Sequence, residues 1–262
     1  MLKRNLAPID EKMWEEIDDR AKEVLESYLS ARKVVNVNGP KGLDYTVVPE
    51  GRLEESDDNK SDVCYGVYKV KPLTEARIEF EIDRWELDNI IRGAEDVELA
   101  PLEEAAKKIA LFEENAIYNG LEESMIEGLC DSSEQETIDL GNDSDSIMQA
   151  ITEGMLRLQS VFTKKPYVLV VGKEAFKRIN THSMGYPLSK AIKELLGTEI
   201  VYSEAVEGAF LLPYDHEDLE MTIGKDLSIG YQSSDNNKVR FFITESFTFR
   251  VLDPDIIVKF EV

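Results

Sequence analysis

Residues 44 to 82 contain two long extended segments joined by a strongly polar stretch. One segment leads out from Tyr45, the polar residues 54 to 62 follow, and a second segment returns from Val63 to Val70. This pattern predicts a long β-hairpin with a solvated tip. Two strands alone offer no core, so a hairpin of this length cannot bury itself inside a small domain. It must fold back on its own chain or lie on a neighbouring molecule.

An amphipathic helix is predicted after a short N-terminal arm, with Asp10 as its capping residue. Its apolar residues recur at helical spacing: Trp14, Ile17, Ala21, Val24, Leu25 and Tyr28. The opposite face is charged, so we expect the apolar stripe to pack on the body of the same subunit. Arg32 to Val37 alternates weakly and predicts a strand, which ends at a turn over residues 38 to 42.

Two further helices and one buried strand are predicted in the middle of the chain. Pro101 opens a long helix to about Asn119, and a second helix runs from Ile147 to Phe162 after the polar loop 131 to 146. The continuous apolar run Tyr167–Val171 is typical of a central strand that is buried on both faces.

The remainder combines two short helices with many strands. A short helix is predicted from Lys173 to Ile179, an exposed loop from Asn180 to Tyr186, and a helix from Pro187 to Leu196. Strict alternation predicts a strand over 77–83. After residue 196 only strands are expected, at Glu199–Tyr202, Ala209–Leu212, Glu220–Ile223, Leu227–Tyr231, Val239–Arg250 and Ile256–Phe260. This order of elements indicates an α+β fold.

Composition limits the classes of partner. The 262 residues suffice for one large domain or two modest ones, and 42% of them are hydrophobic. The formal net charge of −23 argues against nucleic acid and against anionic membranes as main partners. We expect no transmembrane helix and no signal peptide. Cys64 and Cys130 form no motif, which fits a reducing, cytoplasmic setting.

No catalytic or metal-binding motif is recognisable. His182 and His216 lie in separate predicted loops without a second ligand at helical spacing, so we predict no zinc site. Residues 57 to 62 hint at a calcium loop but lack its central glycine and terminal glutamate. Nucleotide-binding loops and a nucleophile elbow are also absent from the sequence. We therefore expect no catalytic residues and no required cofactor.

Several sequence blocks resemble those of encapsulin nanocompartment shell proteins of family 1, the linocin- or bacteriocin-like group. They run in family order from residue 2 to 260: Leu2-Lys-Arg-Asn-Leu-Ala-Pro8, Trp14-Glu-Glu-Ile-Asp-Asp-Arg20, Ala31-Arg-Lys-Val-Val-Asn-Val-Asn-Gly-Pro40, Trp85-Glu-Leu-Asp-Asn89, Ala110-Leu-Phe-Glu-Glu-Asn115, Asp226-Leu-Ser-Ile-Gly-Tyr231 and Phe242-Ile-Thr-Glu-Ser-Phe-Thr-Phe249. The resemblance implies the fold of tailed-phage major capsid proteins.

That fold implies a division of the chain into named parts. The expected parts are an N-terminal arm and helix (1–43), an extended loop (44–75), a peripheral domain with a spine helix (76–131 and 223–262) and an axial domain (132–222). The resemblance further implies self-assembly into an icosahedral cage, with about sixty copies favoured over a larger shell. The cage would enclose a ferritin-like iron-storage protein or a dye-decolorising peroxidase in the cytoplasm.

A docking site for the cargo's C-terminal peptide is implied on the inner wall. Positions that match the family's site are Leu25, Tyr28, Arg32, Val34, Asn36, Ile229, Tyr231 and Phe247. Each apolar member could equally be a core residue. Asn36 stands where relatives can carry Asp, which weakens recognition by charge. We expect Arg32→Glu to assemble normally but lose cargo.

Two further sites follow from the resemblance. The loop lining the five-fold pore would comprise Asn180, Thr181, His182, Ser183, Met184 and Gly185. Five copies of His182 around the axis would form a ring that binds or filters ions. Trp85 would offer a stacking face to a bound flavin. The alternatives are a plain surface loop for the first and a structural aromatic for the second.

Two other functions remain open at this stage. A phage-derived capsid protein that packages nucleic acid would share the fold, but the net charge of −23 opposes it. A protease-like enzyme would need a nucleophile beside a base, and no cysteine or serine has a recognisable motif with either histidine.

Overall fold

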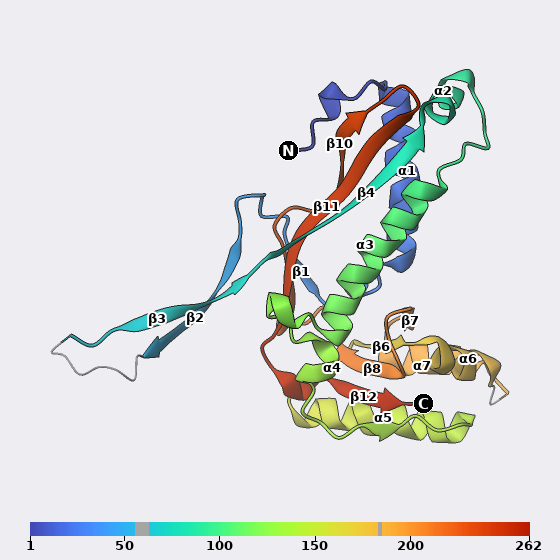
Figure 1. Cartoon of the computed structure of the whole chain (residues 1–262). Coiled ribbons are helices and arrows are strands. Elements are labelled where there is room, and N and C mark those ends of the chain that lie inside the picture. Colours follow the sequence, from blue (N-terminus) through green and yellow to red (C-terminus); the bar gives the residue numbers. More distant parts are fainter. Residues whose placement is uncertain (56–62, 183–184) are drawn as a thin grey trace.

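The computed structural model describes residues 1–55, 63–182 and 185–262, and its α+β composition agrees with the predicted class. Figure 1 shows an upper part with a long sheet packed against helices, a lower part with a second sheet, and a hairpin that projects sideways between them. The upper part contains α1 (Glu11–Tyr28), α2 (Arg84–Arg92), α3 (Ala100–Asn119), β1 (Asn36–Asn38), β4 (Thr74–Asp83), β9 (Leu219–Ile223), β10 (Ser228–Ser234) and β11 (Lys238–Val251).

The other elements form the lower part, the hairpin and the connections. The lower part contains α5 (Ser144–Ser160), α6 (Lys173–Thr181), α7 (Leu188–Leu196), β5 (Ile138–Asp139), β6 (Tyr167–Val171), β7 (Val201–Tyr202), β8 (Ala209–Pro213) and β12 (Val258–Glu261). The hairpin is β2 (Val47–Glu55) with β3 (Gly66–Pro72). Short helices connect these parts: η1 (Arg4–Leu6), η2 (Ala31–Lys33), η3 (Glu122–Ser124), α4 (Gly128–Ser132) and η4 (Pro254–Ile256).

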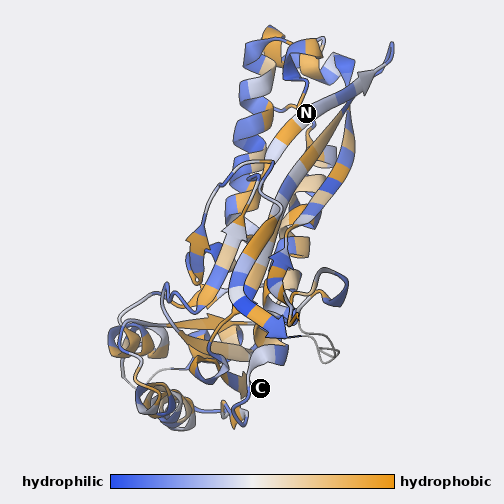
Figure 2. Ribbon diagram, turned by 90° about the vertical axis from the view of Figure 1, so that its left-hand side faces the viewer, coloured by the Kyte–Doolittle hydropathy of each residue, from blue (hydrophilic) through white to orange (hydrophobic). Residues whose placement is uncertain are grey.

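β11 organises the upper sheet. One edge of this long strand pairs antiparallel with β4, and the other edge pairs first with β10 and then with β9. Figure 2 shows apolar and polar residues alternating along the long strands, as the sequence predicted. Nevertheless every residue from Phe241 to Phe249 is buried, so both faces of this stretch are covered. The polar face is therefore part of the interior.

α1 and α3 cover one face of the upper sheet. Asp10 caps α1 by accepting a hydrogen bond from the backbone N–H of Met13 at 3.2 Å, which confirms the predicted start. The Trp14 ring meets Phe241 edge-on, with 5.4 Å between the ring centroids. The predicted apolar stripe thus packs on its own subunit.

The lower sheet has the order β5-β12-β8-β6-β7. All residues of β6 and β8 are buried, which confirms the prediction of a central strand over Tyr167–Val171. α5, α6 and α7 contribute apolar side chains to the same core. The apolar side chains of this sheet are therefore buried by other parts of the same chain.

The β2–β3 hairpin projects away from both parts (Figure 1). Its strands pair antiparallel, with an irregularity between Pro49 and Leu53, and β3 continues almost directly into β4. The prediction of a long hairpin is confirmed, while residues 56–62 of the predicted tip lie outside the described part of the chain.

Three local predictions need correction. The strand expected over 32–37 is a helical turn, η2, followed by the short β1, because the backbone N–H at Ala31 is bound to a carboxylate of α3. Asn180 and Thr181 belong to α6 rather than to a loop. The last strand, β12, was expected in a peripheral domain formed partly by 223–262, but it pairs with β8 and β5 of the lower sheet.

Candidate functional site

A groove lies between α1, the N-terminal segment and β10. It encloses about 440 Å³, and it is lined by Leu2, Arg4, Asp18, Ala21, Lys22, Leu25, Glu26, Leu29, Arg32, Asp226, Leu227, Ser228, Ile229 and Ile243. Leucine and isoleucine side chains form its floor, and charged side chains of both signs form its rim. Such a groove suits an extended apolar segment with a few polar contacts.

The groove forms because the apolar stripe of α1 extends beyond the last fully buried residue of the helix. The first three turns bury Met13, Trp14 and Ile17, and Ala21 is the last buried residue of the helix. Leu25 falls one turn later on the same face and remains only partly covered. The apolar stripe therefore continues past the point where the sheet fills the space beneath it.

Arg32 closes one end of the groove with three carboxylates. Its guanidinium donates to Glu113 of α3, with a shortest distance of 2.5 Å, to Asp226 at 2.8 Å and to Glu245 of β11 at 3.2 Å. The side chains of Glu113 and Glu245 have no solvent exposure. Burial opposes the charge of Arg32, but the carboxylate contacts outweigh it and raise the guanidinium pKa.

One positive charge cannot neutralise two buried carboxylates and a third at the rim. Burial, and then the nearby charge of Glu113, raise the pKa of Glu245 well above its ordinary value. In the described part of the chain, Glu245 Oε1 is buried without a hydrogen-bond partner. The raised pKa favours the protonated form of the Glu245 carboxyl group in the folded subunit.

A third buried acid, Glu114, connects the end of α1 to the lower part. Glu114 accepts hydrogen bonds from the Ser30 hydroxyl, from the backbone N–H of Ala31 at 2.8 Å and from the Ser203 hydroxyl at 2.9 Å. Burial raises the pKa of Glu114 despite these donors. Ser203 directly follows β7, so α3 joins the end of α1 to the lower sheet through this side chain.

The structure divides the predicted docking residues into three groups. Leu25, Arg32 and Ile229 line the groove together. Tyr28, Asn36 and Tyr231 are half-buried and do not line the groove, and they contact Lys107, Asp215 and Ser234 respectively. Val34 and Phe247 are fully buried core residues, so their assignment as peptide contacts is wrong for this subunit.

The prediction that Arg32→Glu assembles normally also needs correction. We expected Arg32→Glu to assemble normally, but this substitution would place a further carboxylate among Glu113, Glu245 and Asp226. Uncompensated buried charge of one sign is strongly destabilising. The signal was present in the sequence, because Glu245 interrupts the apolar face that Phe241, Ile243 and Phe247 share.

The predicted pore residues are only partly described. Asn180 and Thr181 end α6, His182 follows and is half-buried, and Ser183 and Met184 lie outside the described residues. Gly185 adopts a φ of 76°, a conformation that favours glycine. Their role as a pore lining stays a prediction.

Trp85 lies at the start of α2 and is 69% exposed. Asp83 caps this helix by accepting from the backbone N–H of Trp85 at 2.8 Å. The guanidinium of Arg92 lies 5.4 Å from the centroid of the indole ring. The ring thus offers an accessible stacking surface beside a cation, which leaves the flavin prediction in place.

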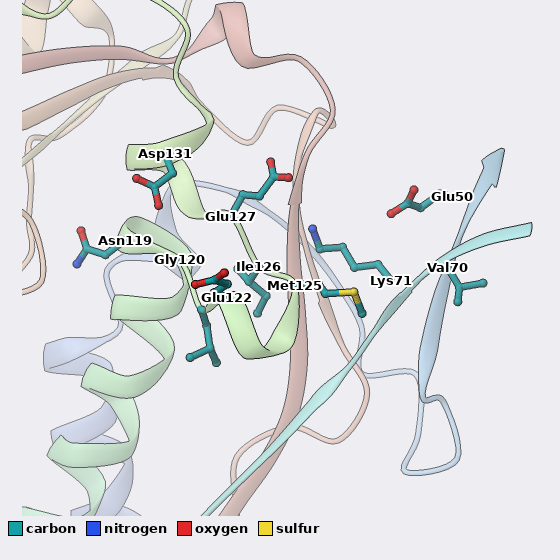
Figure 3. Close-up of a pocket in the computed structure, with 11 residues that line it drawn as sticks. Glu50, Val70, Lys71, Asn119, Gly120, Glu122, Met125, Ile126, Glu127 and Asp131 are labelled. Atoms are coloured by element: carbon teal, nitrogen blue, oxygen red, sulfur yellow. The ribbon is translucent and has the colours of Figure 1, made fainter. Parts of the chain in front are cut away.

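A larger hollow of about 730 Å³ was not anticipated from the sequence. It lies between the base of the hairpin and the C-terminal end of α3 (Figure 3). Lys71 points into it, with Glu50 on one side and Glu127 on the other. Burial lowers the pKa of Lys71. Because its lining is split between the projecting hairpin and the body, this hollow marks where the two meet.

No metal site emerges from the described residues. Among residues 1–55, 63–182 and 185–262, no three His, Cys, Asp or Glu side chains are grouped so that they could hold a metal ion. The calcium-like stretch 57–62 lies outside these ranges. None of the helices described is long and apolar enough to cross a membrane.

Comparison with known proteins places the chain in a family. Residues 1–248 match the family described as "Encapsulating protein for peroxidase". The type 1 encapsulin shell protein of Rhodococcus erythropolis is 34% identical over 98% of both chains. Its counterpart in Mycobacterium tuberculosis is 31% identical over 95% of this chain and 94% of the relative.

Solved structures agree at the level of the fold. A virus-like particle protein from Pyrococcus furiosus superposes with a TM-score of 0.70 and 14% identity, covering 94% of this chain and 98% of that one. The holo-SrpI encapsulin complex of Synechococcus elongatus gives a TM-score of 0.53 at 9% identity, covering 87% and 84%. The capsid of an empty GTA particle gives a TM-score of 0.57 at 15% identity, covering 89% of this chain and 90% of that one. The predicted capsid-like fold is therefore confirmed.

Proposed function

This chain belongs to the encapsulin shell-protein family, and from that membership we propose that it is the repeating structural subunit of a closed icosahedral protein compartment. Relatives over nearly the whole length are named shell proteins. The role proposed is confinement of guest proteins.

The β2–β3 hairpin is the observation that carries this proposal. Leu53 lies directly opposite Tyr68 in the strand pairing, and the two are 53% and 74% exposed. Val67 and Val70 on the returning strand are also exposed. An isolated two-stranded hairpin with apolar side chains gains little stability in water, so these residues fit a surface that neighbouring copies cover.

Electron microscopy of the purified protein tests the assembly. We expect discrete hollow spheres of uniform diameter, with about sixty subunits favoured. Particle mass measured by light scattering would distinguish this count from a larger shell. A protein that remains monomeric or dimeric at micromolar concentration would overturn the proposal.

We place the guest at the groove between α1 and β10. The apolar floor around Leu25 and Ile229 can take alternate side chains of an extended peptide, and Asp226 offers a rim acceptor. The family description supports a peroxidase as guest, and a ferritin-like iron-oxidising protein is the other candidate. Iron chemistry would then reside on the guest.

Recovery of co-purifying guest from shells tests this placement. Leu25→Asp introduces a charge into the apolar floor without touching the buried acids, and we expect assembled shells that lack guest. Leu156→Asp, at an exposed leucine of α5 that does not line the groove, is the control and should load normally. Equal loading by both variants would place the guest elsewhere.

Two minor proposals accompany this function. Flavin could stack on Trp85, and a yellow purified shell whose colour is lost in Trp85→Ala would support it. We place the compartment in the cytoplasm, in line with free thiols at Cys64 and Cys130. Nucleic acid inside purified shells, seen as strong absorbance at about 260 nm, would instead favour a capsid role.

A further inference from the structure

The N-terminal arm, residues 1–6, contacts the outer edge of β10 at Tyr231. In the part of the chain that the structure describes, β10 pairs with β11 only. On its opposite edge, the backbone N–H of Tyr231 donates to the carbonyl oxygen of Leu2 at 2.8 Å. Figure 1 shows the N-terminal segment beside this strand. The arm therefore uses a strand edge that any extended chain could use.

Other backbone groups of β10 also point toward this outer edge. Along a strand, residues two positions apart direct their N–H and C=O groups to the same side. Since Tyr231 faces the arm, Ile229 presents its backbone groups to the same edge. The side chain of Ile229 lines the groove. Backbone pairing and apolar recognition are thus available together.

The arm is held by few contacts. None of the residues in η1 is buried. Its main anchor is Arg4, which pairs with Asp18 at 2.6 Å and lies 3.9 Å from the centroid of the Trp14 ring. Lys3 adopts a φ of 51°, in the left-handed region that favours glycine. A segment with one main anchor and an unfavourable backbone conformation can be displaced.

The arm and the groove form one continuous surface. Leu2 and Arg4 line the groove together with Leu25, Leu29 and Ile229. An extended segment that replaced Leu2 on the β10 edge would place alternate side chains on the same apolar floor. Leu2 shows that a backbone carbonyl pairs with this edge, while Arg4–Leu6 of the arm form a 3-10 helix and leave the rest of the edge to an extended segment.

We propose that residues 1–6 are a displaceable occupant of the β10 edge, and that an extended apolar segment of the guest binds by replacing them. This inference rests on the assignment of the groove as the guest-docking site. Docking then requires an open arm, so the apparent affinity equals the intrinsic affinity multiplied by the fraction of open subunits. Loosening the arm should increase loading.

The variant Arg4→Ala loosens the arm, and Arg92→Ala is its matched control. Like Arg4, Arg92 forms an ion pair with an aspartate, here Asp88 at 3.6 Å, and its guanidinium lies near a tryptophan ring, 5.4 Å from the centroid of Trp85. Arg92 lies on α2, away from the arm. A second variant deletes residues 2–6 and so removes the occupant outright. Hydrogen exchange of the Tyr231 amide reports whether the edge has opened.

Loading is measured with a fluorescent reporter that ends in the C-terminal segment of the protein recovered from wild-type shells. At limiting reporter, we expect roughly threefold more reporter per shell for Arg4→Ala and for the deletion, with faster Tyr231 exchange. Arg92→Ala should match the wild type in both measurements.

Unchanged or reduced loading in the deletion variant, with intact shells and an open Tyr231 amide, would overturn the proposal. Loss of shells on deletion, together with faster Tyr231 exchange but unchanged loading in Arg4→Ala, would assign the arm to contacts between subunits and also overturn it. Absence of reporter from wild-type shells as well would instead refute the docking assignment itself.

Discussion

The β2–β3 hairpin and the lower sheet are both extended structures with many apolar residues, but they bury those residues differently. In the lower sheet, β6 and β8 are buried along their whole length by helices of the same chain. In the hairpin, Leu53, Val67 and Tyr68 are exposed. The chain therefore completes one region by itself and leaves the other incomplete until a neighbour covers it.

The lower sheet therefore contributes mainly to the stability of the subunit, and the hairpin contributes mainly to assembly of the shell. Substitutions in the lower sheet should act on folding, whereas substitutions in the hairpin should act on association. The buried acids around α3 lie between these extremes, because they are enclosed within the subunit but can ionise.

Leu169→Asp in β6 should have the largest effect. Leu169 has no solvent exposure, so an aspartate there would be a buried, unpaired carboxyl group that costs several kcal/mol. We expect no soluble folded protein, as judged by circular dichroism. Val67→Asp in the hairpin should fold with wild-type secondary structure. A folded Leu169→Asp protein would refute the buried position of β6.

Arg32→Ala should be the next most severe change. It leaves the buried Glu113 and Glu245 without their shared cation, at a cost of about 3–5 kcal/mol. Urea unfolding measures this loss. Lys33→Ala, on the exposed neighbouring residue, should change the free energy of unfolding by less than about 0.5 kcal/mol. Equal effects for the two variants would contradict the ion cluster.

Glu245→Gln should change how stability depends on pH. Burial and Glu113 raise the pKa of Glu245 above its unfolded value of 4.5. The stability that this group contributes is complete below the unfolded pKa and is lost as the pH rises through the folded pKa. Glutamine cannot ionise, so the variant should melt a few degrees higher than wild type at about pH 9 and similarly near pH 4.

The control for this pH experiment is Glu54→Gln in the exposed hairpin. It should leave the pH profile of the melting temperature unchanged. Parallel profiles for Glu245→Gln and wild type between pH 4 and 9 would contradict a raised pKa of Glu245 in the folded subunit.

Asp10→Ala should have the smallest effect. It removes the side-chain acceptor for the backbone N–H of Met13 and should cost about 1 kcal/mol. The free energy of unfolding from urea titration measures it. Asp10→Asn keeps an acceptor and should recover most of the loss. A cost as large as that of Arg32→Ala would mean that Asp10 has contacts beyond the cap.

Much of the fold was predictable because periodicity is a local property. The run Tyr167–Val171 and the helix after Pro101 were identified correctly from their apolar patterns. η2 was missed, since its conformation depends on Glu114, more than eighty residues away. β12 was assigned to the wrong sheet because pairing between distant strands leaves no local signal.

The candidate site was less predictable than the fold. Resemblance alone placed Leu25, Arg32 and Ile229 together, and the structure brings them to one groove. Two buried acids could have been found from spacing. Glu113 follows Ile109 by four residues on the apolar face of α3, and Glu245 lies on the apolar face of β11. An acid on such a face indicates a buried partner.

The contrast between the two regions is tested most directly by the double variant Leu53→Thr/Tyr68→Thr. Threonine keeps the preference for strands but removes the exposed apolar pair. Sedimentation velocity should show a subunit that no longer forms shells. Circular dichroism should show the secondary structure of wild type. Lys69→Gln in the same strand should still assemble. Shells of normal size from the double variant would contradict the claim that neighbouring copies cover the hairpin.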